Sequence, residues 1–134
     1  ADSSNAHVGL GLALAKQSKL DEAVRHYRRA LELDPTNVHA HTNLGLALGR
    51  QGKRDQAITH FRTAIEVDPR NANAHGALAL SLAIQGKFAE AIPNYRKAVE
   101  LDPKRADTHF LLGYALARRG ELDEAIVHFR TSLK

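Results

Sequence analysis

The sequence predicts an all-α fold built from four helix-turn-helix repeats, which gives about eight helices. An Asp-Pro pair recurs at a fixed spacing, so that Pro35, Pro69 and Pro103 lie 34 residues apart. Proline lacks the backbone N–H that a helix interior needs and pushes the preceding residue out of the helical region, so each pair ends a helix. Apolar residues at helical spacing and recurring glycines keep the same period. Such a period is typical of a stack of helical units whose function is to recognise other proteins.

Alignment on these prolines gives the repeats 4–37, 38–71, 72–105 and a shortened 106–134. We expect the four repeats to form one domain that covers residues 1–134. The last repeat stops just before its own Asp-Pro would be due. We therefore expect the chain to be a fragment of a longer protein.

The first helix of each repeat is predicted by an apolar stripe followed by a glycine. In the second repeat, Ala40, Leu44, Ala47 and Leu48 share one face at 100° per residue. Gly52 follows, where a helix end commonly needs a residue that tolerates positive φ. The equivalent residues in the other repeats are Gly86, Gly120 and, as the exception, Ser18.

The second helix of each repeat is predicted to begin near an aspartate. In the second repeat Asp55 precedes an apolar stripe that contains Ala57, Ile58 and Phe61. An aspartate at this place can cap free N–H groups and complement the helix dipole, as can Asp21 and Asp123. The third repeat has Ala89 at this place, and Pro93 lies close enough to the helix start to be tolerated.

Composition places the chain among folded, soluble proteins. Of 134 residues, 43% are hydrophobic and 25% are charged, and no run approaches the roughly 18 apolar residues that span a membrane. The chain has no cysteine, which excludes disulfides and thiolate sites and leaves the compartment open, with the cytoplasm as the preferred expectation. The net charge of +4 comes from interleaved charges and indicates no particular partner.

The four repeats resemble the tetratricopeptide repeat, a 34-residue helical hairpin with the pattern W-x2-L-G-x2-Y, A-x3-F and P. The matching residues are His7, Leu10, Gly11, Leu14, Ala23, Tyr27, Ala30 and Pro35; His41, Leu44, Gly45, Leu48, Ala57, Phe61, Ala64 and Pro69; His75, Leu78, Ala79, Leu82, Ala91, Tyr95, Ala98 and Pro103; and His109, Leu112, Gly113, Leu116, Ala125, Phe129 and Ser132. Histidine replaces the tryptophan in every repeat, leucine replaces the first tyrosine, and Ala79 replaces one glycine. The resemblance covers essentially the whole chain and implies a right-handed α-solenoid.

Small residues mark the places where helices are expected to approach closely. Gly45, Ala57 and Ala64 are the examples in the second repeat. A bulky side chain at such a place forces the helices apart at a cost of roughly 1–3 kcal/mol.

A second apolar row lies off the core stripe of the first helices. On the helical wheel Leu46 is about 145° from the centre of that stripe, so it cannot serve the same core. Leu12, Leu80 and Tyr114 hold the same place in the other repeats. An apolar strip edged by amide and basic groups suits a groove for a peptide, because pockets hold side chains and donors orient the backbone. The predicted groove residues are Asn5, Val8, Leu12, Lys16, His39, Thr42, Asn43, Leu46, Arg50, Asn73, Leu80, Ile84, Phe110, Tyr114 and Arg118.

The resemblance implies the same surface, because tetratricopeptide repeats commonly bind peptides along the concave face lined by their first helices. The alternative is that part of this row only packs between neighbouring hairpins. Lys16, Arg50 and Arg118 could select acidic ligands or could simply be solvated. Receptors of this family that bind chaperone tails hold a carboxylate with a Lys, Asn and Arg clamp, of which only Asn43 is present here, so that subclass is not expected.

The eight histidines are interpreted as packing residues. His7, His41, His75 and His109 recur once per repeat, which spaces them too regularly to converge as metal ligands. The ring of His41 is expected to pack by its body and keep one nitrogen in water. The alternative is a weak adventitious metal site at His39 and His41.

No chemistry is expected of the chain itself, so we predict a protein that is not an enzyme and has no cofactor, metal or catalytic residue. Arg28, Arg62, Arg96 and Arg130 form a row in which three have a glutamate four residues on, which predicts surface ion pairs. Nucleic-acid binding would need stacking aromatics along this row, and none are in phase.

Two other functions stay open. The last helix would expose Ile126, Phe129 and Leu133, so copies could stack end to end into a self-assembling scaffold. The stretch 40–45 is similar to repeats that precede O-linked N-acetylglucosamine transferases, so the chain could instead be the recognition arm of a larger enzyme such as a glycosyltransferase.

Overall fold

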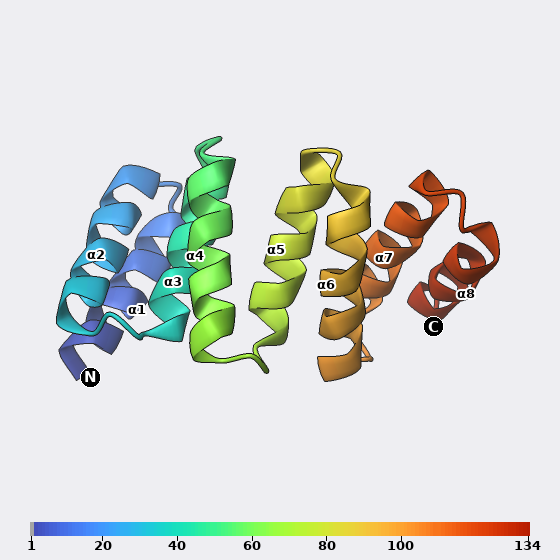
Figure 1. The fold of residues 1–134 in the computed structure, drawn as a ribbon. Coiled ribbons are helices and arrows are strands. Elements are labelled where there is room, and N and C mark those ends of the chain that lie inside the picture. The colour runs from blue at the N-terminus through green and yellow to red at the C-terminus, as the bar shows by residue number, and fades with distance from the viewer. Residues whose placement is uncertain (1) are drawn as a thin grey trace. The chain divides into compact units, whose positions relative to one another are not determined.

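The computed structural model describes residues 2–134 and, over that range, contains helices and no strand (Figure 1). The elements are α1 (Asp2–Lys16), α2 (Leu20–Leu33), α3 (Val38–Arg50), α4 (Arg54–Val67), α5 (Ala72–Ile84), α6 (Phe88–Leu101), α7 (Ala106–Arg118) and α8 (Leu122–Ser132). They form two compact bodies, an N-terminal unit that ends at Pro69 and a C-terminal unit that begins at Arg70.

Each unit contains two helical hairpins. In the N-terminal unit α1 packs on α2 and α3 packs on α4, and in the C-terminal unit α5 pairs with α6 and α7 with α8. Within each unit the second helix of one hairpin also packs on the first helix of the next, as α2 does on α3 and α6 on α7. The four predicted hairpins and their order are therefore confirmed.

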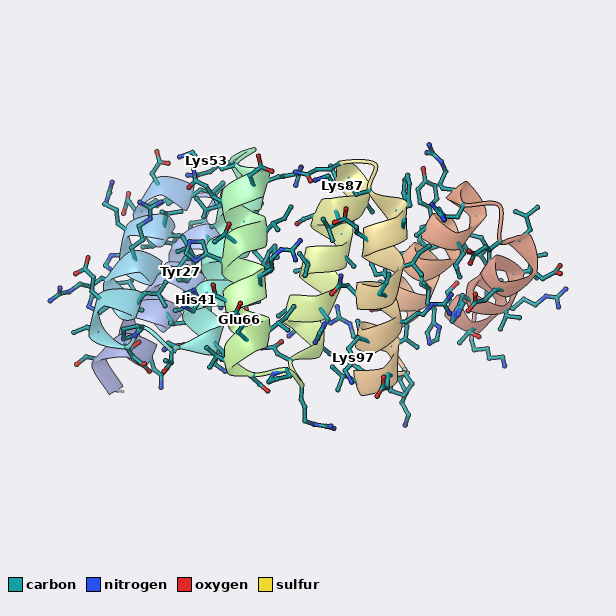
Figure 2. All side chains as sticks on the ribbon, in the orientation of Figure 1. Tyr27, His41, Lys53, Glu66, Lys87 and Lys97 are labelled. Atoms are coloured by element: carbon teal, nitrogen blue, oxygen red, sulfur yellow. The ribbon has the colours of Figure 1, made fainter. Side chains whose placement is uncertain are left out.

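The predicted helix stops are confirmed at both kinds of turn. The helices α2, α4 and α6 end two residues before their prolines. Gly52, Gly86 and Gly120 have φ values of 82°, 78° and 82°, in the left-handed region that favours glycine. Ser18 takes the same conformation, with φ of 63°. Lys53 and Lys87, which follow two of these glycines, stand at the turns that join the helices of their hairpins (Figure 2).

The predicted aspartate caps are wrong. The N-cap residues of the second helices make no side-chain cap bond; they are Lys19, Lys53, Lys87 and Glu121. The aspartates lie in the first turn, where a negative charge still complements the helix dipole. Side-chain caps occur on α3 and α5 instead: the Oδ1 of Asn37 accepts from the backbone N–H of Ala40 at 3.0 Å, and that of Asn71 accepts from Ala74 at 3.0 Å. α6 runs unbroken through Pro93, as expected.

Aromatic rings of the second helices fill the centres of the first three hairpins. Tyr27, Phe61 and Tyr95 are buried among alanines and leucines. A Cβ atom added to Gly11 or Gly45 would lie 2.5 Å from a ring carbon of Tyr27 or Phe61. The small residues therefore make room for a ring of the partner helix as well as for close helix approach.

A buried polar network joins the first hairpin to the second. The hydroxyl of Ser4 donates to the carbonyl of Ala30 at 2.9 Å, and the Nδ2 of Asn37 donates to that hydroxyl at 2.8 Å and to the Oδ1 of Asn5 at 3.0 Å. One asparagine thus caps α3 and binds α1 at the same time.

Candidate functional site

The apolar row predicted on the first helices is exposed in both units. In the N-terminal unit Leu12 and Leu46 expose 39% and 47% of their surface, and in the C-terminal unit Leu80 and Tyr114 expose 39% and 45%. Their neighbours on the core stripe, such as Leu44 and Leu48, are almost fully buried. These four side chains therefore serve the surface of their unit and not its core.

In the N-terminal unit an open cavity of about 310 Å³ lies beside this row. Its walls come from the first helices of both hairpins, and Tyr27 is the lining residue from α2. The lining residues are Leu12, Ala15, Lys16, Tyr27, Asn43, Leu46, Ala47 and Arg50.

The C-terminal unit has a cavity of about 400 Å³ at the corresponding place. Its walls come from α5 and α7, and Tyr95 and Phe88 contribute from α6. The lining residues are Leu80, Ala83, Ile84, Gly86, Phe88, Tyr95, Leu111, Tyr114 and Arg118.

The two cavities are built from equivalent positions 68 residues apart. Leu12, Tyr27 and Arg50 in the first cavity correspond to Leu80, Tyr95 and Arg118 in the second. The tyrosines alternate with Phe61 and Phe129 along the repeats. Each of the two cavities therefore has a tyrosine of a second helix in its wall.

Burial and charge set the state of these tyrosines. Burial raises the pKa of Tyr95 to about 12, so its hydroxyl stays protonated. Burial also raises the pKa of Tyr27, and the positive charge of Arg50 opposes part of this rise. Tyr27 lies among the helices of the N-terminal unit (Figure 2). Both phenols thus offer a neutral donor at the cavity wall.

The arginines at the two cavity rims are held differently. Nη1 of Arg50 donates to the backbone carbonyl of Ala15 at 3.3 Å. Nη1 of Arg118 donates to the hydroxyl of Tyr114 at 3.2 Å, and its guanidinium carbon lies 4.9 Å from the centroid of the Phe88 ring. Arg118 therefore contacts two aromatic side chains, whereas the side chain of Arg50 is bonded to a backbone carbonyl.

The structure brings nine of the predicted groove residues to the cavities. Five line the N-terminal cavity and four the C-terminal cavity: Leu12, Lys16, Asn43, Leu46 and Arg50, then Leu80, Ile84, Tyr114 and Arg118.

The other six predicted residues lie outside the cavity linings. Val8 and Thr42 are buried, and the Thr42 hydroxyl donates to the carbonyl of Val38, so neither offers the surface that the wheel suggested. His39 is exposed, and Asn5 accepts from Asn37. The remaining two are Asn73, which accepts from Arg105 at 2.6 Å, and Phe110, which packs on Phe129.

Sequence reasoning missed the contribution of the second helices. Tyr27, Tyr95 and Phe88 line the cavities but are not among the predicted groove residues. The alternation of tyrosine and phenylalanine at one repeat position was the available signal, because a core position without access to a polar partner has no need of a hydroxyl.

The histidines form hydrogen-bonded pairs inside three of the hairpins. The Nδ1 atoms of His7 and His26, of His41 and His60, and of His109 and His128 lie 3.1 Å apart. The second ring nitrogen of His41 lies 2.9 Å from the carbonyl of Pro35. Both nitrogens of His41 therefore have protein partners, and the expectation of a wet nitrogen is wrong.

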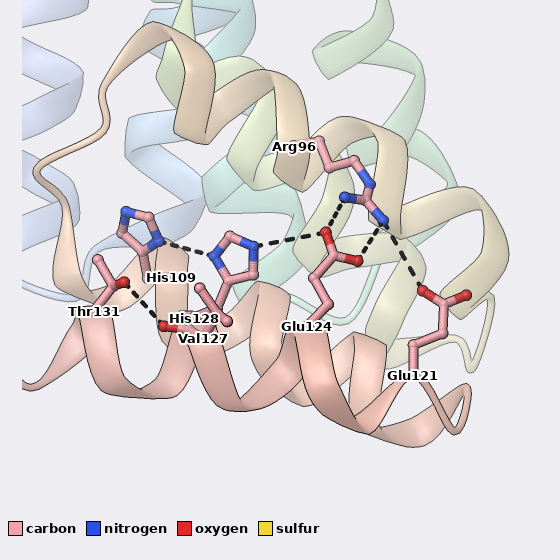
Figure 3. Close-up of polar contacts among 7 residues, drawn as sticks. All are labelled: Arg96, His109, Glu121, Glu124, Val127, His128 and Thr131. Carbon is pink, nitrogen blue, oxygen red and sulfur yellow. Dashed lines mark hydrogen bonds and ion pairs between the residues drawn. The ribbon is translucent and has the colours of Figure 1, made fainter.

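The arginine row does not form the ion pairs that the four-residue spacing predicts. Arg96 binds Glu124 through both terminal nitrogens, and its Nη2 lies 3.9 Å from Oε2 of Glu121, so α6 is joined to the last hairpin (Figure 3). The glutamates predicted as partners of Arg28 and Arg96 are bound by Arg29 and Lys97 instead. Spacing of four residues alone did not identify the partners, because a long arginine side chain also reaches the next helix.

Neither a cluster of metal ligands nor a helix that could span a membrane occurs in the part of the chain that the structure covers. No group of three or more metal-ligating side chains comes together there. None of the helices in residues 2–134 has the length and apolar character needed to cross a membrane.

Comparison with solved structures gives the same fold. A crystal structure of MamA matches with a TM-score of 0.90 at 24% identity, over 98% of this chain and 77% of that chain. MamA 41-end from Desulfovibrio magneticus RS-1 matches with a TM-score of 0.86 at 25% identity, over 97% and 73%. YrrB, described as a TPR protein with an unusual peptide-binding site, matches with a TM-score of 0.85 at 26% identity, over 94% and 65%. The predicted class of α-solenoid is confirmed by these likenesses. No curated protein matches the chain.

Family models match nearly all of the repeats. One described as "TPR repeat" matches residues 11–52, and one described as "Tetratricopeptide repeat" matches residues 42–106 and 85–134. Together with the four hairpins and their fixed period, these matches show that the chain belongs to the tetratricopeptide repeat family.

Proposed function

We propose that the chain is a protein-interaction scaffold that binds an extended segment of a partner protein on the surface of its first helices. The observation that carries this proposal is the recurrence of one cavity in both units, each beside two exposed apolar side chains of the predicted row. Exposed leucines beside an open cavity keep apolar area in contact with water. A bound side chain would remove that area from water, which is favourable.

The polar groups around the cavities suit a peptide backbone. Nδ2 of Asn43 already donates one bond to the carbonyl of His39 at 2.9 Å. Its second N–H and the guanidinium of Arg50 can donate hydrogen bonds, and an extended peptide has carbonyl groups that accept them. The likeness to YrrB, described as having a peptide-binding site, supports the same kind of ligand. The proposal requires no catalytic chemistry of the chain.

The proposal is tested with peptides selected from a random library displayed on phage, with the wild-type chain as bait. Binding of a selected peptide is then measured by fluorescence anisotropy. We expect Leu46→Asp and Tyr114→Asp to weaken binding at least tenfold, because a carboxylate is placed on the apolar row.

Val67→Asp is the matched control. Val67 exposes 42% of its surface, close to the 47% of Leu46, but it lies at the end of α4 and outside the cavity lining. Circular dichroism should show the same helix content in all variants. Equal loss of binding in Val67→Asp and Leu46→Asp, or no selected peptide at all, would overturn the proposal.

A second candidate function is stacking of copies of this chain. Leu10 exposes 48% of its surface, whereas its equivalents Leu44, Leu78 and Leu112 are buried. Ile126 exposes 46%, whereas Ile58 exposes 9%. Contact of α8 with α1 of another copy would repeat the packing of α2 on α3.

Self-association is tested by light scattering of the purified chain over a range of concentrations. Stacking predicts a mass that rises with concentration and returns to that of one chain in Ile126→Glu and Phe129→Glu. A constant mass of one chain would exclude it at the concentrations measured.

A further inference from the structure

The two cavities are equivalent in position but not in charge. Lys16 and Asn43 of the N-terminal cavity are replaced by Ile84 and Leu111 in the C-terminal cavity. The N-terminal cavity therefore has two cations and an amide at its edge. The C-terminal cavity has one cation, Arg118, and aliphatic side chains in place of the lysine and the amide.

The cations of the N-terminal cavity have no negative charge beside them in its lining. None of the eight lining residues is an aspartate or glutamate. Arg50 donates one bond to a backbone carbonyl, and a guanidinium has five N–H donors, so donors remain for a ligand. Its charge reaches Tyr27, whose pKa it lowers against the effect of burial. The field inside this cavity is therefore positive.

Arg118 at the C-terminal cavity, unlike Arg50, is held by aromatic side chains. It donates to Tyr114 and stacks over Phe88, and the rings of Phe88 and Tyr114 themselves pack edge to face with centroids 6.2 Å apart. A guanidinium in this setting forms part of an aromatic wall. Release of Arg118 toward a carboxylate would break both contacts.

We infer that the two cavities select different side chains: the N-terminal cavity binds an aliphatic residue adjacent to a carboxylate, and the C-terminal cavity binds an uncharged apolar residue. This inference rests on the proposed function and adds the chemistry of the partner segment to it. The partner is thus a protein segment in which an acidic and an aliphatic residue are neighbours. Charge-assisted bonds from Lys16 and Arg50 hold the acid, and the wall of Leu12, Leu46 and Ala15 holds the aliphatic group.

The test uses the same random peptide library on the whole chain and on the double variant Lys16→Glu, Arg50→Glu. We expect peptides selected by the wild type to be enriched in Asp or Glu next to Leu, Ile or Val. The double variant should instead enrich Lys or Arg at that place, because the charge at the rim is reversed. Replacement of the acid by its amide in a selected peptide should weaken wild-type binding about tenfold.

The chain provides a second, milder variant. Lys16→Ile with Asn43→Leu gives the N-terminal cavity the residues that the C-terminal cavity already has. This variant should keep the affinity for apolar residues and lose most of the preference for acids. Arg25→Glu, which reverses the charge of an exposed arginine of α2 outside both cavity linings, is the control that should leave the acidic preference in place.

The outcomes separate this inference from the proposed function. Selected peptides that need Leu46 but show no acidic residue, or whose acidic preference persists in both cavity variants, would overturn the inference and leave the scaffold proposal standing. A library that yields no peptide dependent on Leu46 would overturn both.

Discussion

Ser18 shows how one residue departs from the repeat pattern at an energetic cost. Among the described residues it is the only non-glycine residue with positive φ, at 63°, while its equivalents are glycines. A side chain in the left-handed region costs roughly 1–2 kcal/mol, and glycine gives back part of the difference through the flexibility of the unfolded chain.

We predict that Ser18→Gly raises the free energy of unfolding by about 0.5–1 kcal/mol. Denaturant unfolding followed by circular dichroism measures this directly. Gly52→Ser, the reverse change at the equivalent place, should lower it by a similar amount. A stabilising effect of both substitutions would contradict the assignment of strain to Ser18.

The histidine pairs predict how stability depends on pH. Burial lowers the pKa of His60 first, and the charges of His41 and Arg28 lower it further. Burial and His109 lower the pKa of His128, with Arg96 lowering and Glu124 raising it in addition. A folded-state pKa below the usual 6.5 means that the unfolded chain binds more protons as pH falls below that value.

We therefore predict that the melting temperature is constant above about pH 6.5 and falls as pH decreases from there toward the lower folded-state pKa values. The double variant His60→Asn, His128→Asn should show a smaller fall. Asparagine already stands at this place in the third repeat, as Asn94, so the substitution fits the fold. The carboxyl groups with lowered pKa, those of Asp34, Asp107 and Glu124, act only at more acid pH, so thermal scans between pH 7 and 5 isolate the histidines.

At the scale of the helix, Asn37 joins the start of α3 to the first hairpin. Its side chain caps α3 and also donates to Ser4 and Asn5. We predict that Asn37→Ala lowers the free energy of unfolding by about 2–3 kcal/mol, because a cap and two partly buried bonds are lost together.

Asn37→Ser separates the two contributions, since serine can cap the helix but is too short to reach Ser4. Chemical unfolding should place this variant between the wild type and Asn37→Ala. If serine and alanine were equally destabilising, the cap would contribute nothing.

Ala57 tests the close approach of helices in the second hairpin. Ala57 is fully buried in α4, whereas Thr59 of the same helix is exposed. We predict that Ala57→Leu lowers the free energy of unfolding by about 1–3 kcal/mol and that Thr59→Leu changes it by less than about 0.5 kcal/mol. Equal melting temperatures of the two variants would contradict the packing described.

The elements themselves could be predicted from the sequence because their signals are local. Proline and glycine act on their own backbone, and the stripe of Leu44 and Leu48 needs only helical geometry. The partners of polar side chains could not be predicted in this way. Asp55 is predicted to cap α4, but the N-cap is Lys53, two residues earlier, and Arg96 reaches Glu124 in another helix.

The candidate site shows the same division. The wheel placed Leu46 and Arg50 on the surface correctly because both lie on one helix. It could not show that Val8 is buried or that Tyr27 of the next helix reaches the cavity, because both depend on how two helices pack.

At the scale of the whole molecule, the 34-residue period runs unbroken through residues 69 and 70, where the two compact units meet in sequence. We propose on this basis that the four repeats are one folding domain. In repeat proteins, the free energy of unfolding is the sum of the stabilities of the single repeats and the interaction energies between neighbouring repeats. In a protein of this size, the interactions between neighbours favour a single cooperative transition.

We predict one transition when unfolding in guanidinium chloride is followed by circular dichroism and by tyrosine absorbance, with coincident midpoints. Ser18→Gly in the first hairpin should shift the whole transition. Two separated transitions, of which only one responds to Ser18→Gly, would show that the units fold independently.

The placement of the tyrosines has a practical consequence. The chain has three tyrosines and no tryptophan, and Tyr27, Tyr95 and Tyr114 all line the two cavities. Tyrosine emission of the unlabelled chain therefore originates only where a ligand is proposed to sit. Titration with a peptide that lacks aromatic residues should change that emission, and Tyr27→Phe should restrict the signal to the C-terminal cavity.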